Sequence, residues 1–135
     1  METVNHECYV SLEVAKLLKE AGFDWHTNLV YVDDKLLTNP YTEDWNNTIP
    51  DTYTSAPTLE VAQRWLREEK GMDVIIYVFG GSPDKTYTYE ANTWTTWKND
   101  MVVDKEYIGN SYTTYEGAQE AGIKKALEII LEKGE

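Results

Sequence analysis

The sequence predicts an α+β fold, a small antiparallel sheet with three helices packed on it, in the order α-β-β-loop-α-β-β-β-α. Two observations lead to this prediction. Three segments open alike, with a hydroxyl residue followed two positions later by glutamate: Ser11-Leu12-Glu13, Thr58-Leu59-Glu60 and Thr114-Tyr115-Glu116. The hydroxyl can cap free N–H groups, and the glutamate lies near the positive end of the helix dipole. Between these starts, β-rich segments alternate with turn residues, which favours hairpins.

The first half of the chain predicts one helix, two short strands and a long loop. A helix is expected over residues 12–21, where apolar residues recur from Val14 to Ala21 at helical spacing and Gly22 ends the pattern. Strands are expected over 28–32 and 35–37, around a turn at Asp33-Asp34. Residues 38–57 contain three prolines and read as a loop whose aromatic residues pack it down.

The second half predicts two helices around three strands. A helix over 58–70 ends at Gly71, and the apolar run 72–79 reads as a central strand. Further strands are expected over 86–89 and 101–108, with turns at 80–84 and 99–100. The last helix, 114–133, carries a broad apolar stripe in which Ala118, Gly122 and Ala126 allow close approach to a sheet.

The length favours a single domain, residues 1–135, with 1–55 and 56–135 as candidate sub-units. The three similar helix starts have two explanations, internal duplication or convergence on a common capping pattern.

The charge balance disfavours nucleic acid as a direct partner. The net charge is −12, and residues 36–63 contain no Lys or Arg, so the surface should repel phosphates. Acidity can serve solubility, a docking face for a basic partner, or mimicry of nucleic acid in a defence inhibitor. The longest apolar run, 74–79, is too short to cross a membrane, and the single Cys8 suits a reducing cytoplasm.

Reactive residues are few, and no catalytic, metal or cofactor site is predicted. His6, Glu7 and Cys8 could form part of a zinc site completed by His26 or Asp24, but the chain has no second cysteine. Cys8 could also pair with His6 or His26 as nucleophile and base, but no recognised motif surrounds it. Adjacent carboxylates such as Glu68-Glu69 do not face each other across a cleft. A small enzyme that uses Cys8 with a histidine remains an alternative.

The aromatic residues supply the predicted interaction surface. The patch expected to contact a protein partner consists of Tyr41, Glu43, Asp44, Trp45 and Tyr53. Aromatic rings flanked by carboxylates suit a basic, partly apolar surface. Trp65 is expected in the core. The strand aromatics Tyr87, Tyr89, Trp94 and Trp97 suit either core packing or a binding face.

Two resemblances add to this reading. The segments 9–24, 56–67 and 115–123 together resemble small uncharacterised proteins of gut anaerobes and their phages, which implies a phage or mobile-element setting. The order of elements in 58–133 is similar to double-stranded-RNA-binding domains. Their basic cluster opens the last helix, where this chain has Tyr115-Glu116. The function expected from the sequence is therefore a non-enzymatic, cytoplasmic protein that binds another protein.

Overall fold

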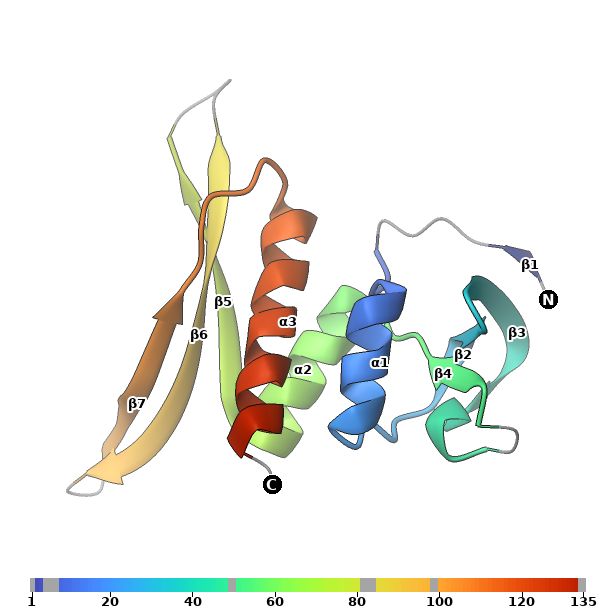
Figure 1. Ribbon diagram of the computed structural model, residues 1–135. Helices are drawn as coiled ribbons and strands as arrows, with labels where there is room; N and C mark the ends of the chain where they lie inside the picture. The colour runs from blue at the N-terminus through green and yellow to red at the C-terminus, as the bar shows by residue number, and fades with distance from the viewer. Residues whose placement is uncertain (1, 4–7, 49–50, 81–84, 98–99, 134–135) are drawn as a thin grey trace.

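The computed structural model describes residues 2–3, 8–48, 51–80, 85–97 and 100–133 (Figure 1). Helices α1 (Leu12–Glu20), α2 (Leu59–Lys70) and α3 (Tyr115–Lys133) lie between two antiparallel sheets. The first sheet has the order β1-β3-β2-β4, from β1 (Glu2–Thr3), β2 (Thr27–Val32), β3 (Lys35–Glu43) and β4 (Tyr53–Ser55). The second has the order β5-β6-β7, from β5 (Met72–Phe79), β6 (Thr86–Trp97) and β7 (Asp100–Ile108). The predicted α+β class is confirmed.

Two details of the prediction are corrected. The strands form two sheets rather than one, because the short strand β4 pairs with β2 and completes a sheet separate from β5–β7. The predicted loop over 38–57 is largely structured. Its first residues continue β3 to Glu43, a 3-10 turn η1 spans Trp45–Asn47, and β4 follows. Residues 81–84 of the expected turn at 80–84, and residue 99 of the expected turn at 99–100, lie outside the described residues.

The three helix starts are capped as predicted. The hydroxyl oxygens of Ser11, Thr58 and Thr114 accept hydrogen bonds from the backbone N–H three residues later, at 3.3, 3.1 and 3.0 Å. Two helix ends also follow the prediction, since Gly22 and Gly71 have φ values of 97° and 63°. Only glycine adopts this left-handed backbone without strain.

The second sheet turns one face to the helices. Val74 of β5 pairs with Ala91 of β6, and both belong to the buried core. Alternation along β5 then directs Ile75, Tyr77 and Phe79 to the opposite face. The central strand is β6, so β5, which the sequence places in the centre, is an edge strand. An apolar run alone does not distinguish the two positions.

One continuous core joins both sheets to the helices. Trp65 of α2 is buried as predicted and makes an edge-on contact with Phe23, with 5.4 Å between ring centroids. The Glu120 carboxylate on α3 accepts a hydrogen bond of 2.6 Å from the backbone N–H of Ser11, where the dipole of α1 favours negative charge. This bond ties α3 to the start of α1.

Tyr31 is expected to make the protein sensitive to alkali. Its buried hydroxyl donates to the Val10 carbonyl at 2.8 Å. Burial raises the pKa of Tyr31 above the usual 10.0, and the negative charge of Glu120 raises it further. Because the folded state holds the proton more tightly than the unfolded state, this stabilisation is complete below about pH 10 and is lost as the pH rises further.

Urea unfolding of Tyr31→Phe across this pH range checks the expectation. The variant should lose about 1 kcal/mol at pH 7 through the missing hydrogen bond, yet its stability should fall less steeply above pH 10. Tyr41→Phe, at an exposed ring, is the control and should follow the unmodified protein. A decline in Tyr31→Phe as steep as that of the unmodified protein would contradict the assignment.

Candidate functional site

The predicted interaction patch is only partly on the surface. Tyr41 is 73% exposed and Glu43 is exposed, whereas Asp44 and Tyr53 are half-buried. Trp45 is only 7% exposed, so its side chain packs in the core and presents little surface to a partner.

The burial of Trp45 has a clear structural cause. Its indole Nε1 donates a 2.6 Å hydrogen bond to the Thr27 carbonyl at the start of β2. Its ring also meets Tyr53 edge-on, with 5.9 Å between centroids. These contacts hold η1 against β2 and β4 of the first sheet. Trp45 therefore stabilises the fold of the segment that contains η1 and β4.

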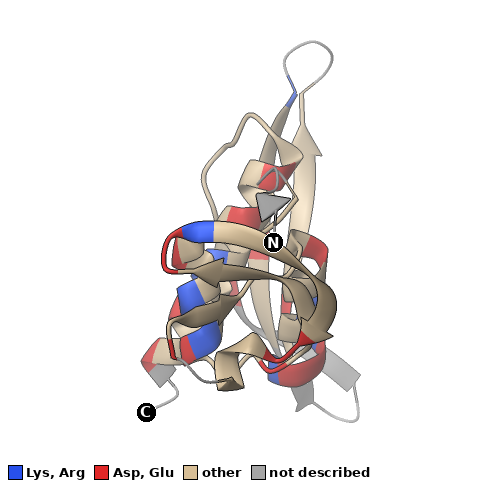
Figure 2. Cartoon of the chain, turned by 90° about the vertical axis from the view of Figure 1, so that its right-hand side faces the viewer, with Lys and Arg blue, Asp and Glu red and all other residues tan. Residues whose placement is uncertain are grey.

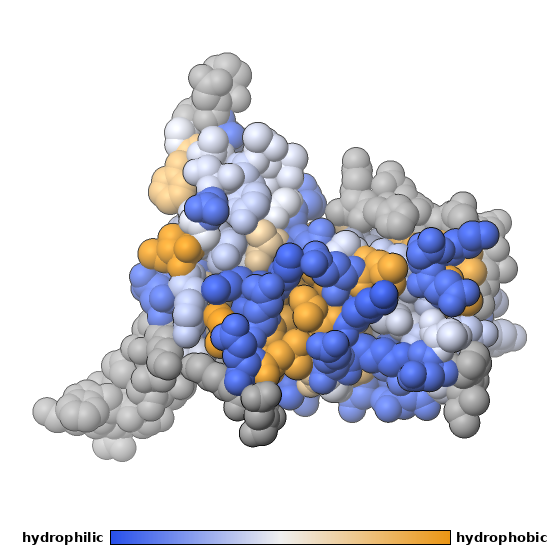
Figure 3. All heavy atoms as spheres, in the orientation of Figure 1, coloured by the Kyte–Doolittle hydropathy of each residue, from blue (hydrophilic) through white to orange (hydrophobic). Residues whose placement is uncertain are grey.

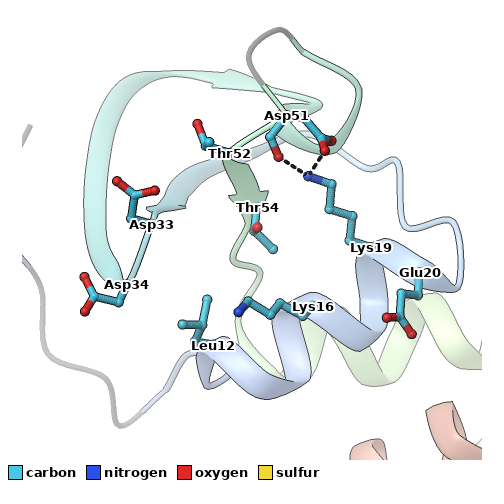
Figure 4. Close-up of a pocket in the computed structure, with 9 residues that line it drawn as sticks. All are labelled: Leu12, Lys16, Lys19, Glu20, Asp33, Asp34, Asp51, Thr52 and Thr54. Carbon is cyan, nitrogen blue, oxygen red and sulfur yellow. Dashed lines mark hydrogen bonds and ion pairs between the residues drawn. The ribbon is translucent and has the colours of Figure 1, made fainter.

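The hollow beside α1 shows no convergent chemistry (Figure 4). It encloses about 690 Å³ between α1, the β2–β3 turn and β4. Lys19 is already engaged, because its Nζ donates to the Asp51 and Tyr53 carbonyls at 2.8 Å and lies 3.3 Å from the Asp51 carboxylate. Figure 4 shows the carboxylates of Asp33 and Asp34 directed away from Lys19. These side chains do not converge on a common point where a ligand atom could sit.

Cys8 borders a smaller hollow of about 230 Å³ between the starts of α2 and α3. The thiol is exposed, and the other lining residues are Thr58, Leu59, Glu60, Tyr115, Glu116 and Gln119. Among the described residues, this lining holds no histidine to serve as a base. His6 lies outside the described residues.

The described residues form neither a metal-binding cluster nor a membrane-spanning helix. Over the described ranges, His, Cys, Asp and Glu nowhere gather in a group of three or more that could hold a metal ion. Within the same ranges, no helix has the length and apolar character that crossing a bilayer requires. Figure 2 shows Asp and Glu interleaved with Lys and Arg on one side of the molecule, rather than aligned in an unbroken acidic row.

The face of the second sheet that points away from the helices is the strongest candidate, and we call it the open face (Figure 1). The register places Ile75, Tyr77, Phe79, Thr88, Glu90, Asn92, Glu106 and Ile108 on it, and of these Thr88 and Asn92 are buried. Phe79 and Ile108 are 53% and 66% exposed, and Tyr77 is 40% exposed. Figure 3 shows apolar atoms at the surface along this side of the molecule. Glu90 pairs directly with Ile108, so a carboxylate lies within the apolar row.

Two glutamates act on the hydroxyl of Tyr77 on the open face. Partial burial raises the pKa of its hydroxyl above the usual value, and the charge of Glu90, a hydrogen bond to Glu90 and the charge of Glu106 raise it further. Both glutamates are therefore close enough to act on the phenol. A positive group placed beside Tyr77 would meet a favourable potential.

The amino-acid pattern did not point to the open face. It singled out strand aromatics on β6, but Tyr87 and Tyr89 pair with Val78 and Ile76 and so lie on the helix side. One sequence signal could have indicated this face. The apolar run Tyr77-Val78-Phe79 stands at the end of a strand, next to a glycine-rich turn, where a strand can extend beyond the helices that pack on it. The side chains of Trp94 and Trp97 lie outside the described part of the chain.

Comparison with known proteins adds no family to this description. No protein-family model matches the chain, and neither a curated protein nor a solved structure matches it.

Proposed function

We propose that this chain is a non-enzymatic binding protein that acts in the cytoplasm, in a phage or mobile-element setting, and recognises a basic, partly apolar segment of another protein. The observation that carries the proposal is the open face, where Tyr77, Phe79 and Ile108 stay exposed beside Glu90. Contiguous apolar surface flanked by polar groups is typical of protein-binding sites.

The charges select the kind of partner. Glu90 and Glu106 make the open face electronegative at Tyr77, and the net charge of −12 attracts a basic segment from a distance. An amphipathic helix with leucines on one side and lysines beside them matches this face. The interleaved charges in Figure 2 favour this function over mimicry of nucleic acid, which needs carboxylates in rows.

A designed peptide tests the proposal without knowledge of the natural partner. The probe is a fluorescent amphipathic helical peptide of about four turns, with a leucine face flanked by lysines, and the matched probe carries glutamate at each lysine position. Fluorescence anisotropy should show that the lysine peptide binds and that added salt weakens binding. Equal binding of the glutamate peptide, or no binding of either, would contradict the proposal.

Two variants locate the binding surface. Ile108→Ser should weaken binding of the lysine peptide about tenfold or more, the range of an interface hot spot. Tyr41→Ser is the matched control, because Tyr41 is equally exposed but belongs to the first sheet, beyond the helices. An equal loss in both variants would show that the peptide does not bind through the open face.

A further inference from the structure

The outer edge of β5 carries a second, distinct surface. In an antiparallel ladder, every second residue bonds to the neighbouring strand, and the residues between point their N–H and C=O groups the other way. On an edge strand those groups remain available to a further strand.

Three sets of hydrogen bonds determine which way the backbone groups of β5 and β6 point. The Val74 carbonyl accepts a 2.6 Å hydrogen bond from Gln63 of α2, so it points away from β6. On β6, Tyr87 exchanges both backbone hydrogen bonds with Tyr112, at 2.9 and 2.7 Å, and the Tyr89 carbonyl accepts from Gly109 at 3.0 Å. These groups of β6 therefore point away from β5.

The register then identifies the outward residues of β5. Ile76 pairs with Tyr89, and Val78 pairs with Tyr87. Both are thus positions where the two strands exchange no backbone hydrogen bonds, and the backbone groups of Ile76 and Val78 point to the open edge. Earlier in β5, the outward carbonyl of Val74 is already bonded to the Gln63 side chain. The Gln63 side-chain oxygen in turn accepts a 2.8 Å hydrogen bond from Gln119. Among the described residues, no such cover is found at Ile76 or Val78.

The side chains at this edge favour association. Val78 is 56% exposed on the helix side, while Tyr77 and Phe79 are exposed on the open face. Residues 74–79 carry no charge, so two copies of this strand can lie side by side without opposed like charges. Figure 1 shows the ends of β5 and β6 extending past the first turn of α3.

We infer that a second copy of this chain pairs with β5 along this edge, antiparallel, with Tyr77 opposite Tyr77 of the second copy. This register uses the groups that are available, because Ile76 of each copy exchanges backbone hydrogen bonds with Val78 of the other. Ile75 then lies opposite Phe79, and the open faces of both copies join on one side of a continuous sheet. The inference goes beyond the proposed function, since a monomer retains the open face.

A site-specific disulfide tests the register. Residues opposite each other at a position without backbone hydrogen bonds have Cα atoms about 4.5 Å apart, within the usual range for a disulfide. In a Cys8→Ser background, Tyr77→Cys should form a covalent dimer on mild oxidation. Phe79→Cys is the control and should remain monomeric, because its neighbour is Ile75. Equal cross-linking of both variants would overturn the register.

Light scattering tests the association without a cross-link. The unmodified protein should approach twice its monomer mass as concentration rises, and added salt should favour the dimer by screening the charge of −12 on each copy. Val78→Pro should stay monomeric, because it removes an outward N–H without touching the bonds to β6, whereas Val78→Thr should still dimerise.

These outcomes separate the two proposals. Salt should strengthen dimerisation but weaken binding of the lysine peptide, and Val78 lies on the side away from the open face. A monomer at every concentration, with no Tyr77→Cys cross-link, would overturn the inference and leave a strand of a different protein as the occupant of this edge. Circular dichroism of each variant establishes that it is folded before its mass is compared.

Discussion

Replacement of Trp45 by alanine is expected to lower the free energy of unfolding by about 3–5 kcal/mol, the range for removal of a buried aromatic side chain. The indole is 7% exposed, fills the space beside Tyr53 and donates to the Thr27 carbonyl at 2.6 Å. Its loss leaves a cavity and a buried carbonyl without its partner. Because a domain of this kind has about 5–15 kcal/mol of stability, the loss should be obvious in urea unfolding.

Two further variants separate packing from the hydrogen bond. Trp45→Phe retains much of the ring and removes the N–H donor, so it should lose about 1–3 kcal/mol. Tyr41→Ala, near the end of β3 and shortly before η1, should change stability by less than about 0.5 kcal/mol, since Tyr41 is 73% exposed. A Trp45→Ala variant as stable as Tyr41→Ala would show that the tryptophan belongs to the surface, as the sequence suggests.

The helix boundaries were predictable because the interactions that set them are local. A hydroxyl at Ser11, Thr58 or Thr114 reaches a backbone N–H only three residues away, and the glycines at 22 and 71 adopt a backbone that other residues avoid. Each of these effects depends on a few neighbouring residues. Their presence in the sequence is therefore nearly sufficient to place a helix end.

The division into two sheets was not predictable in the same way. It depends on β4, whose three residues are too few to show an alternating pattern. It also depends on which strands pair, a choice made by contacts between distant parts of the chain. The same reason explains β5, since its apolar run 72–79 fits a central strand and an edge strand equally well.

The burial of Trp45 and the exposure of Tyr77 and Phe79 were not predictable for a related reason. Trp45 lies among carboxylates in the sequence, yet its hydrogen-bond acceptor is Thr27, eighteen positions earlier in the chain. Conversely, Tyr77 and Phe79 read as core because they lie in an apolar strand, but no described helix covers that face of the sheet. In each case the exposure of the side chain depends on which distant segment of the chain packs against it. The composition of the neighbouring residues does not reveal that contact.

Gly122→Ala is expected to destabilise the protein by about 1–3 kcal/mol, although alanine favours a helix over glycine by about 1 kcal/mol. A Cβ atom at this position would lie 2.7 Å from Val74 Cγ1 and 2.9 Å from Tyr89 Cβ. Glycine thus lets α3 lie directly on β5 and β6, the close approach that the small residues of this helix predict. The sign of the change in the free energy of unfolding shows whether the steric clash or the helix propensity is larger. Helix propensity alone would stabilise the variant.

A double-mutant cycle with Val74→Ala identifies the clash. Shortening Val74 removes the atom nearest to the new methyl group, so Gly122→Ala should cost less in the Val74→Ala background than in the unmodified protein. The destabilisation that Gly122→Ala still causes in the Val74→Ala background measures the clash with Tyr89. The Cβ atom of Tyr89 cannot move without shifting β6. Because Gly122 of α3 lies close to both strands, the coupling measures how tightly the helix packs on the sheet at this position. Additive effects of the two substitutions would show that α3 does not pack against Val74 at Gly122.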